Sequence, residues 1–133
     1  MRARVAPDRF AREPDNALYD HGCDLVQAAA GIRRAADAPE AARAVPAVLG
    51  CIEAALAELV VACGALEQTS ARRVRDEAPG HDPRRERVAE RMDRGFASLE
   101  RALADAELSS AAARSLAARA LRAARALPPE RRP

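Results

Sequence analysis

Hydrophobic side chains recur in a regular pattern between Val45 and Leu66. Successive members are alternately four and three residues apart, which is the heptad pattern of a helix that packs lengthwise against other helices. The set is Val45, Leu49, Ile52, Leu56, Leu59, Cys63 and Leu66. On a helix these residues form one stripe roughly 100° wide, with Glu58 nearly opposite. A helix so apolar on one side is not stable alone, so the pattern predicts that other segments cover this stripe.

An earlier helix is predicted from about Pro14–Asn16 to Asp37. Pro14 suits a first helical turn, because that turn needs no backbone N–H from it. The expected inward face is Leu18, Gly22, Leu25, Ala29, Ile32 and Ala36. A short break at 37–40 separates the two helices, which predicts an antiparallel hairpin. Pro46 predicts either a kink in the second helix or a delayed start of its regular part.

The stretch 76–83 is the plainest loop, with two prolines and a glycine. Asp82 followed by Pro83 predicts the capped start of a third helix over about 83–107. Its expected inward face is Val88, Met92, Phe96, Leu99 and Leu103, and its expected solvent face carries the acidic row Glu86, Asp93, Glu100 and Glu107. Ser109 and Ser110 are expected to cap a fourth helix that ends at Leu127.

Together these elements predict an all-α fold, an antiparallel up-down-up-down four-helix bundle. The alternative is three long helices with a kink, in which 83–127 is uninterrupted. Residues 1–14 are expected to form a flexible basic arm, 15–127 a single helical-bundle domain, and 128–133 a disordered tail. Hydrophobic residues make up 49% of the chain and aromatic residues only 2%, which favours close, alanine-mediated helix contacts.

The charge of the chain is unevenly distributed. All 22 basic residues are Arg, as codon usage in a GC-rich bacterial genome would produce, and the net charge is only +2. Residues 15–71 hold three Arg against eight acids, whereas residues 108–133 hold six Arg against one acid. The candidate interaction residues are Arg114, Arg119, Arg122 and Arg125, which lie within about 140° on one helix. They are expected either to pair with acids of the first two helices or to meet an external anionic partner, and nucleic acid is a weak possibility at this net charge.

The cysteines and the termini indicate a cytoplasmic protein. Cys23, Cys51 and Cys63 form an odd set with no CxxC spacing, which is typical of reduced thiols. Residues 1–14 lack the apolar run of a secretory signal, and we expect no membrane span. No metal site or cofactor is expected, because the Glu-x-x-His pairs of a bundle metal centre do not occur.

One short motif resembles a catalytic site. Arg75-Asp76, followed after four intervening residues by His81, is similar to the motif of HEPN domains, which are helical nucleotide-binding bundles with ribonuclease activity. The resemblance covers seven residues. It implies that His81 is the general base for a ribose 2′-hydroxyl and that Arg75 holds the scissile phosphate. Pro79 and Gly80 place His81 in a loop, whereas that family presents the two residues from helix.

The leading functional hypothesis is a small protein–protein interaction or regulatory module without catalytic activity. It is expected to bind other helices, most simply as a homodimer. Two alternatives remain open: the HEPN-like ribonuclease that uses Arg75 and His81, and a bundle that binds an apolar small ligand between alanine-rich helices.

Overall fold

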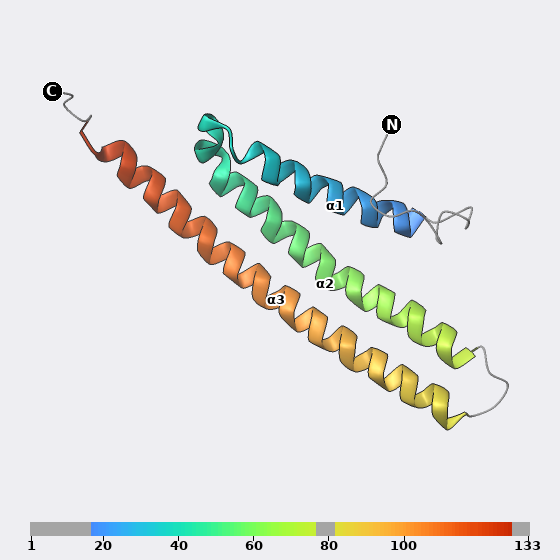
Figure 1. Cartoon of the computed structure of the whole chain (residues 1–133). Coiled ribbons are helices and arrows are strands. Elements are labelled where there is room, and N and C mark those ends of the chain that lie inside the picture. Colours follow the sequence, from blue (N-terminus) through green and yellow to red (C-terminus); the bar gives the residue numbers. More distant parts are fainter. Residues whose placement is uncertain (1–16, 77–81, 129–133) are drawn as a thin grey trace. The chain divides into compact units, whose positions relative to one another are not determined.

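The computed structural model describes residues 17–76 and 82–128, and all regular structure in these ranges is helical. The elements are α1 (Ala17–Ala35), a 3₁₀ helix (Pro39–Ala44), α2 (Val45–Asp76) and α3 (Pro83–Ala126) (Figure 1). The all-α prediction is confirmed. The chain divides into two compact units, Met1–Ala42 and Arg43–Pro133, and each is described by itself. The expected arm over 1–14 lies outside the described residues, as does most of the expected tail, and a single domain over 15–127 stays a prediction.

In the first unit, α1 is an amphipathic helix whose apolar stripe is uncovered. Leu18 is 63% exposed, Leu25 48% and Ile32 43%, and the intervening Gly22 and Ala29 are exposed as well. No other described element of this unit covers the stripe, and the prediction that it points inward stays a prediction. The spacing correctly places the residues on one face, but spacing alone does not determine whether another element covers that face.

The second unit begins with a delayed start of α2. The 3₁₀ helix ends at Ala44, and the α-helix begins at Val45, so Pro46 occupies its first turn. A proline in this position breaks no helical hydrogen bond, because the first N–H groups of a helix have no partner within it. The delayed start is one of the two outcomes that Pro46 predicts, and no kink is needed.

α2 and α3 form a long antiparallel hairpin and pack side by side (Figure 1). From Leu49 to Leu66 the predicted stripe of α2 is at least half-buried, and Cys63 is only 5% exposed. A second stripe is also shielded from solvent, and nearly all of its members directly follow a member of the first stripe in the sequence. It consists of Gly50, Glu53, Ala57, Val60, Gly64, Glu67 and Ala71. The covered face of α2 is thus wider than the Leu stripe alone.

α3 is one unbroken helix of 44 residues, so the expected break at Ser109 and Ser110 is wrong. The described residues form three α-helices where the sequence favoured four, and three long helices were the alternative arrangement. Serine costs an α-helix only a few tenths of a kcal/mol, and the run of alanines after Ser110 strongly favours helix. The start is as expected: the Asp82 carboxylate accepts a hydrogen bond of 2.9 Å from the backbone N–H of Arg84, with Pro83 next to the cap.

The face that α3 turns toward α2 differs from the predicted one. Two rows of residues along α3, each with a seven-residue spacing, are shielded from solvent. Arg114 is the one member of these rows that is exposed. The rows are Ala89, Phe96, Leu103, Ser110 and Ala117, and Glu86, Asp93, Glu100, Glu107, Arg114 and Leu121. The acidic row expected to face solvent is therefore half-buried, whereas Val88 and Leu99, expected inside, are 48% and 46% exposed.

The acidic row lies beside small residues of α2. At Gly64 an added Cβ would lie 3.7 Å from Oε1 of Glu100, an ordinary van der Waals distance, so this carboxylate lies close to the backbone of α2. Among the described residues only Cys63, Ala71 and Ala89 are buried, and of these only Ala89 has no exposed surface. The described part of the second unit therefore holds no buried large apolar side chain of the kind that usually forms the core of a domain.

Candidate interaction surfaces

Arg114 joins the two helices of the hairpin. Its Nε atom donates a hydrogen bond of 3.0 Å to Oε2 of Glu53, and the two side chains are 46% and 26% exposed. The aliphatic part of the same side chain passes over Gly50, where an added Cβ would lie 3.4 Å from Cδ of Arg114. The structure therefore places one of the four candidate arginines in a contact within the chain.

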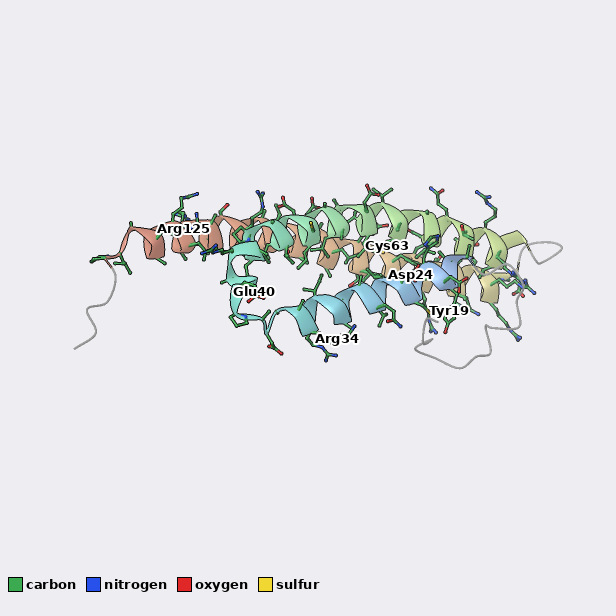
Figure 2. All side chains as sticks on the ribbon, turned by 90° about the horizontal axis from the view of Figure 1, so that it is seen from above. Tyr19, Asp24, Arg34, Glu40, Cys63 and Arg125 are labelled. Carbon is green, nitrogen blue, oxygen red and sulfur yellow. The ribbon has the colours of Figure 1, made fainter. Side chains whose placement is uncertain are left out.

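The other three candidate arginines lie near the end of α3. Arg119, Arg122 and Arg125 are exposed, and no ion pair joins them to an acid within ranges 17–76 and 82–128. α3 extends beyond the first residue of α2 at this end, and Figure 2 shows Arg125 on the extension. With Arg114 level with Glu53, the extension of α3 beyond Val45 is roughly four residues long. These arginines form a basic end that nothing in the hairpin neutralises.

The two residues of the HEPN-like motif are not brought together by anything described. Arg75 lies in the last turn of α2, with its side chain outside the described part, and His81 lies outside the described residues. The ribonuclease hypothesis stays untested.

The described part holds no candidate metal site, and the groove found between α2 and α3 is not apolar. There, no group of three or more His, Cys, Asp or Glu side chains is placed to hold a metal ion. Cys23, Cys51 and Cys63 are free thiols. A groove of about 430 Å³ between α2 and α3 is lined by Gly64, Glu67, Gln68, Ala71, Arg72 and Asp93. Because charged side chains line this groove, it is not the apolar pocket that the small-ligand hypothesis requires.

The most extensive surface feature is a stripe along α3 without a single charge, which we call the uncharged stripe. Its members are alternately four and three residues apart from Val88 to Leu127. They are Val88, Met92, Gly95, Leu99, Ala102, Ala106, Ser109, Ala113, Leu116, Ala120, Ala123 and Leu127. All are exposed except the half-buried Met92 and Ala106, and Leu116 reaches 59% exposure. This stripe lies beside the rows that face α2 and is separate from them.

Gly95 shows how open the uncharged stripe is. An added Cβ at this position would meet no atom within 4 Å. A glycine in the middle of a helix costs about 1 kcal/mol relative to alanine, and here it relieves no contact within the chain. Gly22, in the exposed stripe of α1, is equally unobstructed.

Sequence reasoning found the first members of the uncharged stripe but assigned them to the interior. It expected Ala113, Leu116, Ala120 and Leu127 to face inward on a separate fourth helix, so the two sets were not joined into one stripe. The detectable signal was the absence of Arg, Asp and Glu from every position of that spacing across one long helix.

One segment has the length and composition of a membrane-spanning helix. Pro39–Val74 contains an 18-residue window with a mean hydropathy of 2.0. Such a window is weak evidence, because the central helix of a water-soluble bundle passes the same test. The expectation of no membrane span stays a prediction.

Comparison with known proteins gives no family assignment. No family model, no curated protein and no solved structure matches the chain. The functional argument therefore depends on the surfaces described above.

Proposed function

We propose that this chain is a small protein–protein interaction module that binds other helices. The observation that carries the proposal is the uncharged stripe, exposed along nearly the whole length of a 44-residue helix. Soluble monomeric proteins rarely expose contiguous apolar surface of this extent, and such surfaces usually mark binding sites. The exposed stripe of α1 offers a second face of the same kind.

The basic end of α3 supports the same function. Arg119, Arg122 and Arg125 are exposed near the end of α3, and Arg125 lies beyond the start of α2 (Figure 2). Unpaired charges at the rim of an apolar surface contribute mainly to the rate and orientation of association. An acidic segment of the partner fits this end. The three free thiols fit a reducing compartment, so the proposal places the protein in the cytoplasm.

A membrane location is less consistent with the hairpin. α2 carries Glu53 and the exposed Glu58 within its apolar segment, and α3, which packs along it, carries six arginines and six acids in its first half, 83–107. Ionised side chains in hydrocarbon are costly unless they face a protein interior or water. We therefore assign the apolar segment of α2 to helix–helix packing.

Site-specific photo-cross-linking in cells tests the proposal. A photoreactive amino acid replaces Leu99 in the uncharged stripe, and in a matched control it replaces Arg101, which is exposed on another face of the same helix. The proposal predicts a discrete protein adduct from position 99 and none from position 101.

Two results would contradict the proposal. One is an absence of adducts from position 99 and from a second stripe position, Leu116. The other is co-flotation of the purified chain with phosphatidylcholine vesicles, which would assign the apolar surface to lipid.

A further inference from the structure

We propose that a second copy of this chain occupies the uncharged stripe. The two α3 helices run antiparallel, and Leu99 of each copy packs against Leu116 of the other. This inference deepens the proposed function by naming the partner, and it rests on that function.

The order of residue sizes along the stripe supports the pairing. The stripe reads nearly the same from either end about a midpoint between Ala106 and Ser109. We place two antiparallel copies so that these midpoints coincide. The spacing of four and three residues is the same in both chain directions, so each member of one stripe then lies opposite a member of the other copy's stripe. The pairs are Val88 with Leu127, Met92 with Ala123, Gly95 with Ala120, Leu99 with Leu116, Ala102 with Ala113, and Ala106 with Ser109.

Five of these six pairs match in size. Large side chains meet near the ends and at Leu99 with Leu116, whereas small ones meet at the centre. Small residues at the centre permit close approach of the two backbones, and the Leu pairs on either side fill the space where the helices diverge. A two-fold interface requires such self-complementarity, because the same patch serves both copies.

The charges of α3 favour the antiparallel direction over the parallel one. Its second half, 108–127, carries Arg114, Arg119, Arg122 and Arg125 and no acid. The first half, 83–107, carries six acids, Glu86, Glu90, Asp93, Glu100, Asp105 and Glu107, balanced by as many arginines. Parallel pairing would align the basic halves of both copies. Antiparallel pairing places each basic half beside a half that contains all the acids of the helix.

The area of the stripe is sufficient for a stable dimer. From Val88 to Leu127 the stripe is roughly 60 Å long, and with a width of about 10 Å per copy it buries on the order of 1,200 Å² in total, the lower end of the range for specific interfaces. A strict seven-residue repeat keeps two helices in contact over this length when they coil around each other with a left-handed supercoil. Two α2–α3 hairpins paired in this way form the four-helix arrangement that the sequence favoured, from two chains instead of one.

Disulfide trapping between two differently tagged single-cysteine chains tests both partner and register. In a background of Cys23→Ser, Cys51→Ser and Cys63→Ala, one chain carries Ala102→Cys and the other Ala113→Cys. Mixed and oxidised, they should form a disulfide-linked heterodimer that dithiothreitol reverses, while each chain alone should remain mostly unlinked. Leu108→Cys, exposed on another face of α3, is the matched control and should not link.

Two results of these experiments would contradict the proposed dimer. Linking of each variant to itself, without preference for the mixture, indicates parallel pairing and overturns the proposed register. Light scattering on the unmodified chain gives an answer that does not depend on the cysteine-free background: a monomer at tens of micromolar overturns self-pairing. Position 99 could instead cross-link to a different protein while the chain is monomeric. That result would support the proposed interaction function and contradict only the proposal that the partner is a second copy.

Discussion

The Nε atom of Arg114 on α3 lies 3.0 Å from Oε2 of Glu53 on α2, although the two residues are 61 positions apart in the sequence. This pair fixes the register of the antiparallel hairpin near its open end. Gly50 provides the space through which the Arg114 side chain reaches the carboxylate.

A double-mutant cycle should show that this pair contributes little stability. Arg114→Gln, Glu53→Gln and the double variant should give a coupling free energy of about 0–1 kcal/mol, because the side chains are partly exposed and water screens their charges. Urea unfolding at low salt and at about 1 M NaCl should show that salt reduces the coupling. The double change Arg119→Glu with Arg122→Glu is the control and should alter stability by no more than about 0.5 kcal/mol. A coupling of several kcal/mol that salt leaves unchanged would contradict this assignment.

The stripe of α2 that packs in the hairpin should be sensitive at Leu56. This residue is half-buried, so Leu56→Ala should cost about 1–2 kcal/mol, below the 2–5 kcal/mol typical of fully buried leucines. Glu58→Ala, exposed two residues away, should have almost no effect. Thermal and urea unfolding of both variants provide the comparison. Equal stabilities for the two would mean that the stripe of α2 faces solvent.

The cap of α3 offers a prediction with a conservative control. Asp82→Ala removes the acceptor for the Arg84 N–H and should destabilise the chain by about 1 kcal/mol. Asp82→Asn retains an acceptor oxygen and should recover most of that stability. If the alanine and asparagine variants unfold at the same urea concentration, the side-chain cap does not contribute.

Gly64 should tolerate alanine and gain stability from it. A Cβ there would lie 3.7 Å from the Glu100 carboxylate, an ordinary van der Waals contact, and alanine favours helix over glycine by about 1 kcal/mol. Gly64→Ala should therefore raise the free energy of unfolding by about 0.5–1 kcal/mol. A loss of stability would show that α2 and α3 approach more closely at this level.

The local features of this fold could be predicted from the sequence because each depends on neighbouring residues. Asp82 and Pro83 specify the start of α3, and Pro46 specifies the delayed start of α2. The spacing from Leu49 to Leu66 specifies which residues of α2 share a covered face. These inferences need only the helical period and the chemistry of helix termini.

The errors concern questions that the helical period does not answer. Leu99 lies on an apolar stripe, but whether such a stripe is covered depends on which helix faces it. The acidic row from Glu86 to Glu107 was assigned to solvent because carboxylates usually lie there. In the structure this row is half-buried, and Glu100 lies beside Gly64 of α2. The break at Ser109 divided the uncharged stripe, so its symmetry was not apparent.

The most direct test of the account is a charge-rescue measurement on Leu99 and Leu116. Both are exposed in the chain, at 46% and 59%, so Leu99→Glu and Leu116→Arg should alter the stability of the isolated chain by no more than about 0.5 kcal/mol. In the proposed dimer each change buries an unpaired charge and should weaken association roughly 100-fold or more. Only a mixture of the two variants places Glu opposite Arg on one side and leaves Leu opposite Leu on the other.

Light scattering at one protein concentration reports the result. The account predicts that the unmodified chain has twice the monomer mass of 14.2 kDa, that each variant alone has the monomer mass, and that their equimolar mixture returns toward the dimer. A monomeric unmodified chain, variants that remain dimeric, or a mixture that stays monomeric would contradict it.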